Sequence, residues 1–296
     1  MTRLQSHDIA GISSRLMAYD EELLLRTGHN LRQIACHAVG LKAEDTRRAT
    51  SGIRVGIVPI RWGQGLIEGF CEATAAILGH LGFDAFVTGH ADISGLAEAY
   101  EAKADAVFLA DDNDFVVLNT RAHRSIHNAN ATGRGFAAGL DLMTGGVAGQ
   151  KVLVLGCGRV GRKAIATLLS YGAEVSIYDI DSRCCREFKG SDSGADSVRL
   201  TIEPDFHEAL ARHALIVDAT NAAEIIRGED VSSKTFVVAP GMPLGLSSSA
   251  LDKLSNRLLH DPLQIGVATM GMAVVEQLIE NGGDSASKEN SLHFGD

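Results

Sequence analysis

The sequence has 296 residues, a formal net charge of −10 and a calculated pI of about 5.5. An acidic chain without a block of lysine or arginine is a poor partner for nucleic acid or for an anionic membrane. Aromatic residues make up only 5% of the chain and hydrophobic residues 45%, a balance that suits helices packed on parallel sheets better than an all-β core. The length accommodates two α/β domains, each with its own core.

The ends and the cysteines indicate the compartment. The segment MTRLQSHDIAG lacks the apolar core of a signal peptide, and no run approaches 18 apolar residues. Five cysteines without a CxxC pair indicate neither a disulfide framework nor a zinc ribbon. We therefore expect a soluble cytoplasmic protein with reduced thiols and no bound metal. The sequence does not set the oligomeric state, so a homodimer stays open.

The first half predicts helices followed by a small α/β unit. Apolar residues at helical spacing predict a helix over 8–26, capped by Ser6, and a second over 31–38, whereas the polar stretch 42–52 is typical of a loop or linker. Strands are expected over 55–59, 85–88 and 106–110, with helices over 65–81 and 93–103. This alternation predicts a parallel sheet, with a binding crevice formed by the loops 60–64, 89–92 and 111–114.

The second half predicts a doubly wound domain. A helix over 132–143 is expected to join it to the first unit, and the near-continuous apolar runs 152–155, 214–219 and 235–239 are typical of buried parallel strands. A helix over 265–279 closes the fold. The expected class is α/β, with N-terminal helices and a substrate domain (1–131), a linker helix and Rossmann-type dinucleotide-binding domain (132–281), and a disordered polar tail (282–296).

A glycine motif between a strand and a helix carries the clearest chemistry. Gly156 permits a tight turn, Gly158 lets the backbone approach a pyrophosphate, and Gly161 lets the helix pack on its strand. Asp179 ends the next strand, 18 residues after Gly161, where it can accept the ribose hydroxyls. An α/β turn that binds no nucleotide is the alternative, but the flanking strands, helix and acid favour a dinucleotide.

Charge at Asp179 selects the cofactor. Like charges about 4 Å apart at an effective dielectric near 20 repel by roughly 4 kcal/mol, so a 2′-phosphate is disfavoured and NAD is expected rather than NADP. The cofactor-binding candidates are the motif and the loops after the strands of the same domain: Gly156, Gly158, Arg159, Val160, Gly161, Asp179, Ile180, Thr220, Pro240 and Gly241.

Substrate-binding candidates come from the loops of the first domain. An acidic run, 111–114, follows its third strand, although a helix cap or a solvated turn is a strong alternative. Arg61 can bind a carboxylate bidentately, Trp62 can stack, and Gly63 can bring backbone N–H groups near a ligand; a glycine-rich helix entry is the competing interpretation. His123 and His127 are four apart, but no third metal ligand is evident, so a surface or capping role is favoured.

Several motifs together resemble a known family. VGIVPI with GLIEGF, then GFDAFVT, DISG, FLADD, LVLGCGRVGR and YDID, are similar to the pyrrolysine synthases, the dehydrogenases of pyrrolysine biosynthesis, over about residues 55–275. The resemblance implies NAD-dependent oxidation of the terminal amine of 3-methyl-D-ornithyl-N6-L-lysine, a dipeptide-like small molecule, followed by ammonia loss and ring closure.

The resemblance also implies roles for single residues. Asp111 would lie near the reacting amine, Asn128 among the polar contacts, and Leu4 would help to enclose the substrate. The family carries a small hydroxyl residue where this chain has Trp62 and a smaller neighbour at Arg61, so that contact is not carried over.

The chemistry of the amine restricts the role of Asp111. An alkyl ammonium with a pKa near 10.4 loses its proton in about one molecule in 2,500 at pH 7, which costs about 4.6 kcal/mol. Burial or the neighbouring Asp112, itself a substrate-binding candidate, is expected to raise the pKa of Asp111. We expect Asp111 to orient the amine and relay its proton rather than act as a strong base.

Two other classes stay open. Another NAD-dependent amino-acid, shikimate-like or dipicolinate-like dehydrogenase has the same layout, although no lysine follows the strands of the first domain to form a shikimate-type lysine and aspartate pair. A non-enzymatic NAD(H) sensor is the second alternative, and no DNA-reading segment or basic face supports it.

Overall fold

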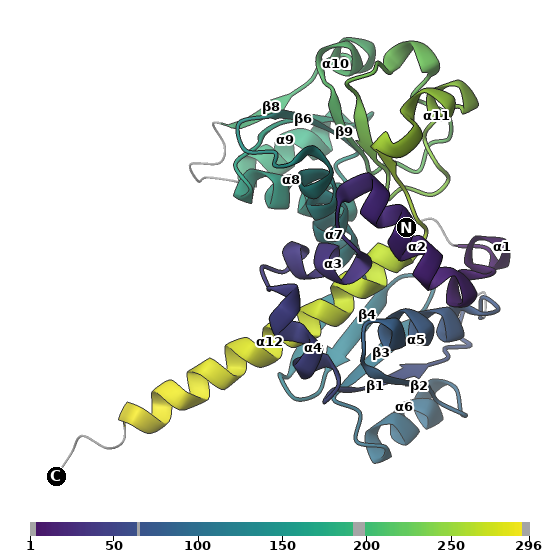
Figure 1. Ribbon diagram of the computed structural model, residues 1–296, viewed down its shortest axis with the longest axis vertical. Coiled ribbons are helices and arrows are strands. Elements are labelled where there is room, and N and C mark those ends of the chain that lie inside the picture. The colour runs from purple at the N-terminus through teal and green to yellow at the C-terminus, as the bar shows by residue number, and fades with distance from the viewer. Residues whose placement is uncertain (1–3, 64–65, 192–198, 292–296) are drawn as a thin grey trace.

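The computed structural model describes residues 4–63, 66–191 and 199–291. It has two sheets in separate lobes, with α7 (Asn128–Thr144) between them and α12 (Gln264–Ser291) starting between them and running out past the N-terminal lobe (Figure 1). This arrangement confirms the predicted α/β class with an N-terminal unit and a Rossmann-type unit.

The N-terminal helices differ from the prediction in two places. The first predicted helix is divided into α1 (Ser6–Ile9) and α2 (Ile12–Thr27), because Gly11 adopts a left-handed conformation with φ of 82°. Gln5, and not Ser6, is the N-cap residue of α1. After α3 (Leu31–Ala38), the expected loop is wrong, since α4 (Ala43–Thr50) forms there and buries two threonines on one face.

The first sheet has the order β2-β1-β3-β4-β5. Its parallel part follows the prediction and consists of β1 (Arg54–Val58), β2 (Asp84–Val87) and β3 (Ala106–Ala110). The helices α5 (Phe70–His80) and α6 (Asp92–Glu101) connect these strands and cover the sheet. The helix α5 begins after Gly69 rather than at residue 65.

An antiparallel hairpin completes this sheet and corrects the prediction of a purely parallel unit. It consists of β4 (Phe115–Asn119) and β5 (Arg124–His127). The alternation of buried and more exposed residues along β4 is the pattern of a half-buried strand. The hairpin places His123 in the turn and His127 at a strand end, so the two histidines do not share a helix face.

The second sheet is entirely parallel, with the order β11-β10-β9-β6-β7-β8. The predicted elements are present: β6 (Lys151–Leu155), α8 (Arg159–Ser170), β7 (Glu174–Tyr178), β9 (Leu215–Asp218) and β10 (Phe236–Val238). The structure adds α9 (Ser182–Ser191), β8 (Leu200–Ile202), α10 (Phe206–Arg212), α11 (Ser248–Leu254), β11 (Leu258–Leu259) and two short 3-10 helices (Gly228–Asp230 and Ser255–Arg257).

One hydrophobic core runs through both lobes. It includes Val55 of the first sheet and Val152 of the second, joined by Phe136 of α7 and Met270 of α12. The helix α7 approaches α8 closely, because a side chain at Gly133 would overlap the backbone of α8. The lobes are therefore packed through shared helices rather than joined by a loose linker.

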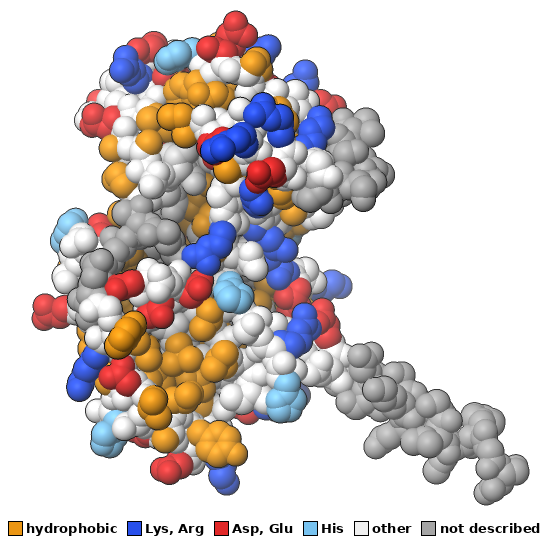
Figure 2. Space-filling model, turned by 180° about the vertical axis from the view of Figure 1, so that it is seen from behind, with side chains coloured by type: hydrophobic (Ala, Val, Ile, Leu, Met, Phe, Trp, Pro, Cys, Tyr) orange, Lys and Arg blue, Asp and Glu red, His pale blue; other side chains and the backbone are white. Residues whose placement is uncertain are grey.

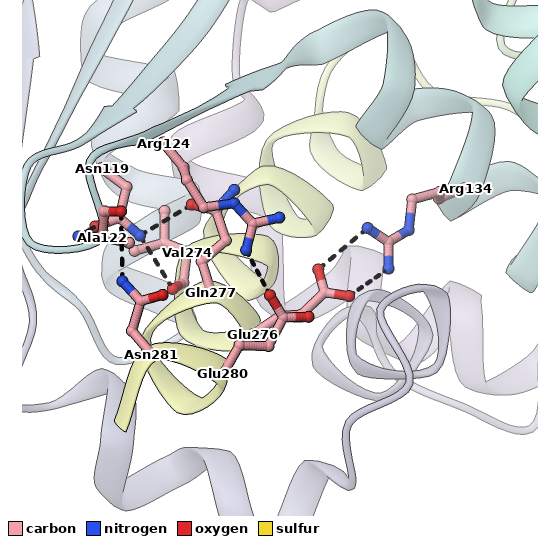
Figure 3. Close-up of polar contacts among 9 residues, drawn as sticks. All are labelled: Asn119, Ala122, Arg124, Arg134, Val274, Glu276, Gln277, Glu280 and Asn281. Atoms are coloured by element: carbon pink, nitrogen blue, oxygen red, sulfur yellow. Dashed lines mark hydrogen bonds and ion pairs between the residues drawn. The ribbon is translucent and has the colours of Figure 1, made fainter. Parts of the chain in front are cut away.

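Polar contacts hold α12 against α7 and against the hairpin of β4 and β5 (Figure 3). Arg134 of α7 donates to both carboxylate oxygens of Glu276 at 2.9 and 3.1 Å. It also donates to the carbonyl of Ala38 at 2.8 Å. On the hairpin, Asn119 donates to the side-chain oxygen of Gln277 at 3.1 Å. These contacts hold the last helix against the N-terminal unit.

The helix α12 also extends farther than predicted. Its helical backbone is described to Ser291, beyond the predicted end at residue 279, and the disorder expected over 282–296 stays a prediction. Figure 1 shows this end leaving the body of the molecule. The sequence after Asn281 still contains helix formers such as alanine, lysine and glutamate, which propagate a helix already begun. Residues 292–296 lie outside the described part.

Candidate active site

A cleft of about 1050 Å³ lies where the carboxyl ends of the two sheets face each other. Its walls come from loops after strands of both lobes and from the first turn of α12. The surface narrows between the lobes, and acidic and basic side chains both gather at the narrowing (Figure 2). Thirteen predicted residues line this cleft: Leu4, Asp111, Asp112, Asn128, Gly156, Gly158, Arg159, Val160, Asp179, Ile180, Thr220, Pro240 and Gly241.

The glycine turn has the geometry of a nucleotide cradle. Gly156 has a φ of 92°, and a side chain there would meet the Ala219 carbonyl oxygen at 2.8 Å. A side chain at Gly161 would overlap the carbonyl of Gly156, so Gly161 supports the turn without lining the cleft. No described atom lies within 4 Å of a Cβ built at Gly158. This open position faces the cleft, where a phosphate group would fit.

Asp179 is held at the end of β7 by the turn itself. Its carboxylate accepts the backbone N–H groups of Cys157 at 2.7 Å and of Asp181 at 2.8 Å. Both contacts fix the carboxylate beside the glycine turn and in the cleft wall, the position expected for a ribose acceptor.

Two further loops are locked together next to the turn. Thr220 donates its hydroxyl to Asp218 at 2.7 Å, and the N–H of Gly241 donates to the carbonyl of Asp218 at 3.3 Å. Burial raises the pKa of Asp218, while the hydrogen bonds from Thr220 partly offset this effect. The loops that carry Thr220 and Gly241 are therefore joined through Asp218 into one wall of the cleft.

An aromatic patch on the same wall was not predicted. Tyr178 and Phe206 line the cleft with ring centroids 5.4 Å apart, and Ile180 beside them is 96% exposed. Flat apolar surfaces of this kind suit an adenine ring. No motif marks Phe206, because it begins α10, a short helix that periodicity did not reveal.

The acidic turn is more tightly organised than expected. Asp111 accepts the N–H groups of Asn113 and Asp114, both at 2.8 Å, and its own N–H donates to the carbonyl of Asp114 at 2.9 Å. These backbone hydrogen bonds lower the pKa of Asp111. The expectation that burial or Asp112 would raise this pKa is wrong, because the carboxylate is nearly fully solvated and lies at the centre of a turn.

The loop of Arg61, Trp62 and Gly63 does not line the cleft. The N–H of Arg61 donates to Asp92 at 2.8 Å, and Trp62 is 78% exposed. Gly63 packs directly against the Asp112 carboxylate, leaving no space for a side chain. Of the predicted crevice loops, 89–92 also lies outside the cleft lining, whereas Ile60 and 111–114 belong to it.

Asn128 lies where α7 and α12 meet at the floor of the cleft. Its side-chain oxygen accepts the Thr132 hydroxyl at 3.2 Å. A side chain at Gly266 would come within 2.9 Å of that oxygen, so α12 can approach only because residue 266 is glycine. Leu4, before α1, also lines the cleft.

A buried carboxyl group in this wall is the main residue that sequence reasoning missed. Asp261 lines the cleft just before α12, accepts the Tyr19 hydroxyl at 2.5 Å, and accepts the N–H of Leu263 at 3.0 Å. Burial raises the pKa of Asp261, and the hydrogen bond from Tyr19 opposes that shift. Its signal was weak, because a single Asp before a helix is usually a cap.

Metal and thiol chemistry receive no support from the described residues. No group of three or more His, Cys, Asp or Glu side chains in them could hold a metal ion. His127 lies 3.9 Å from the Asp114 carboxylate rather than beside His123 as a ligand pair. All five cysteines are free, and burial raises the pKa of Cys157 inside the glycine turn.

Comparison with known proteins agrees with this geometry. Residues 8–126 match the family model "Pyrrolysine biosynthesis protein PylD, N-terminal domain", and residues 125–241 match "Alanine dehydrogenase/PNT, C-terminal domain". The pyrrolysine synthase of Methanosarcina acetivorans is 30% identical over 91% of this chain and 98% of its own length.

Solved structures share the fold. Shikimate dehydrogenase from Aquifex aeolicus has a TM-score of 0.51 and 16% identity, covering 76% of this chain and 91% of its own. Quinate dehydrogenase from Corynebacterium glutamicum, solved with NAD, has a TM-score of 0.51 and 13% identity, covering 76% and 93%.

The two-lobed fold, the glycine cradle and these matches define an oxidoreductase of the nicotinamide-dependent dehydrogenase class. Within that class the chain belongs to the pyrrolysine synthase family, and its role is in pyrrolysine biosynthesis. None of the helices, as far as residues 4–63, 66–191 and 199–291 describe them, has the length and apolar content to span a bilayer.

Proposed function

We propose that this enzyme uses NAD to oxidise the terminal amine of 3-methyl-D-ornithyl-N6-L-lysine, with ammonia loss and ring closure to L-pyrrolysine. The observation that supports this most is that a dinucleotide cradle and the carboxyl groups of Asp111 and Asp261 line one cleft. A cleft of this kind suits a cationic dipeptide-like molecule.

The residues present fit NAD. Gly156 and Gly158 leave a cradle that a Cβ would fill or narrow, the N-terminus of α8 adds favourable dipole charge, and Asp179 is fixed where a 2′-phosphate would be repelled. Ile180, Thr220, Pro240 and Gly241 would complete the walls. When bound, the nicotinamide would accept the hydride released from the carbon that bears the amine.

The carboxyl groups divide the proton chemistry. Asp111, whose pKa is lowered, would stay ionised and hold the substrate ammonium in place. Asp261, whose pKa burial raises, is the stronger base and would take the proton that the ammonium must lose, directly or through water. Asn128, at the start of α7 and next to Gly266 of α12, would orient the same amine.

Ring closure needs no further oxidant. Loss of hydride and a proton leaves an imine, and the ornithine α-amine then forms the ring C=N bond as ammonia leaves. If the imine is first hydrolysed to the aldehyde, the water added is lost again on closure. Exclusion of bulk water by Leu4 and the apolar wall would favour the direct route.

One assay tests the proposal and its alternatives. The purified enzyme is given NAD or NADP with methylornithyl-lysine, and reduced cofactor is followed by absorbance and product by mass. We expect pyrrolysine with NAD, at least tenfold lower kcat/KM with NADP, and a smaller NAD preference in Asp179→Asn. Turnover of a shikimate-type or other amino acid instead would indicate a different dehydrogenase. Cofactor binding without turnover of any of these substrates would indicate a sensor.

A further inference from the structure

Arg159 connects the two walls of the cleft. It is the first residue of α8, and its guanidinium donates through Nη1 to the Asp114 carboxylate at 2.6 Å and through Nη2 to the carbonyl of Asn113 at 3.0 Å. Arg159 belongs to the dinucleotide lobe, whereas both acceptors belong to the acidic turn of the other lobe. A guanidinium with two acceptors in fixed directions restrains orientation as well as distance.

The acidic turn transmits this restraint to Asp111. The N–H groups of Asn113 and Asp114 both donate to Asp111 Oδ1, and the carbonyl of Asp114 accepts the N–H of Asp111. The turn therefore moves as one unit: a shift of the Asp114 backbone carries the Asp111 carboxylate with it.

The charges around Asp114 show which contact dominates. On its own lobe His127 approaches the carboxylate at 3.9 Å, too far for a hydrogen bond, while Arg159 from the other lobe lies at 2.6 Å. Both side chains of the pair are about half exposed, so the contact is accessible and sensitive to salt.

We infer that Arg159 is a positioning residue that aligns the Asp111 turn with the cofactor site across the cleft. This inference rests on the proposed function, since the alignment matters for hydride release from the substrate held by Asp111. It gives the glycine turn a second role, because the segment that cradles the cofactor also sets the position of the Asp111 carboxylate, which holds the substrate.

Steady-state kinetics of Asp114→Asn, Arg159→Gln and the double variant test the alignment. An exposed pair is worth little, so we expect kcat/KM for the substrate to fall about fivefold at low salt in each single variant. The kcat/KM of the double variant should be no lower than that of the less active single variant. The difference in kcat/KM between each variant and the wild type should shrink at high salt. In Asp114→Asn the affinity for NADH should change less than twofold, which separates alignment from cofactor binding.

A substrate-independent measurement keeps the inference separate from the proposed function. Hydrogen exchange of peptides covering 108–119 should accelerate at least threefold in Arg159→Gln, whereas Arg121→Gln, which removes an exposed arginine paired with Asp105 within one lobe, should not change it. Unchanged exchange in Arg159→Gln, or additive kinetic losses in the double variant, would overturn the alignment. Absence of turnover in the wild type, with faster exchange in Arg159→Gln, would reject the proposed substrate and keep the alignment.

Discussion

The two walls of the cleft are built in different ways. On the dinucleotide wall, the geometry comes from backbone: Gly156 and Gly161 permit a turn that no side chain could enter, and Asp179 is held by N–H groups of that turn. On the substrate wall, the chemistry comes from side chains of distant segments, because Asp111 follows β3, Asn128 begins α7 and Asp261 lies between β11 and α12. A wall made of backbone tolerates few substitutions, while a wall made of side chains can change its specificity.

The largest effect is expected from the substrate wall. Asp261→Asn keeps the shape and an acceptor for Tyr19 but cannot take a proton, so kcat should fall about 100-fold. The carboxylate must be ionised to act, and burial raises its pKa, so wild-type kcat/KM should decline as the pH falls through a value above the ordinary value of about 3.9.

The variant should lose this acid limb while keeping its affinity for NADH. Thermal unfolding and NADH binding check that Asp261→Asn is folded. An unchanged pH profile with full activity would remove Asp261 from the proton pathway.

Gly158→Ala tests cofactor binding at the dinucleotide wall, whose geometry comes from backbone. A methyl group there meets no described atom within 4 Å, and its φ of −77° suits alanine, so stability should be unchanged. Because the methyl would occupy the space of the pyrophosphate, the Kd for NADH should rise about 20-fold. Gly79→Ala in α5, also without a neighbour within 4 Å, is the matched control and should leave the Kd as it was. Equal affinities in the two variants would place the cofactor elsewhere.

Asp111→Asn tests whether Asp111 binds the substrate or only stabilises the acidic turn. Asparagine keeps an oxygen for the N–H groups of Asn113 and Asp114 but loses the charge that holds an ammonium. We expect kcat/KM for the substrate to fall about tenfold, mostly through KM. Turnover within about threefold of wild type would leave Asp111 with the capping role alone.

The smallest functional effect is expected from the polar contacts that hold α7 and α12 in place. Arg134→Met removes three hydrogen bonds between α7, Glu276 and Ala38, so the free energy of unfolding in urea should fall by about 2 kcal/mol with little change in kcat. Arg124→Gln removes an exposed pair with Glu280 and should cost less than about 0.5 kcal/mol. A large loss of kcat in Arg134→Met would show that the position of α12 matters for catalysis as well as for stability.

The difference between the walls also explains what the sequence could predict. The glycine turn and Asp179 lie within one stretch of 24 residues, from Gly156 to Asp179, so local pattern was sufficient to place them. The pairing of Asp261 with Tyr19 joins positions 242 residues apart, which no local pattern contains. The hairpin of β4 and β5 was missed because its strands are short and half-exposed. The roles of Arg61 and Trp62 in substrate binding stay a prediction, and their place outside the cleft lining gives it no support.

The position of α12 has a consequence for how the polypeptide is made. Gly271 of this last helix packs on Leu78 and Phe83, and Asn119 of the hairpin bonds to the carbonyl of Val274. The N-terminal lobe thus lacks part of its core until the first turns of α12 have been translated. During synthesis, its apolar sheet face is exposed while more than 100 further residues emerge, an interval in which a chaperone would find a binding surface.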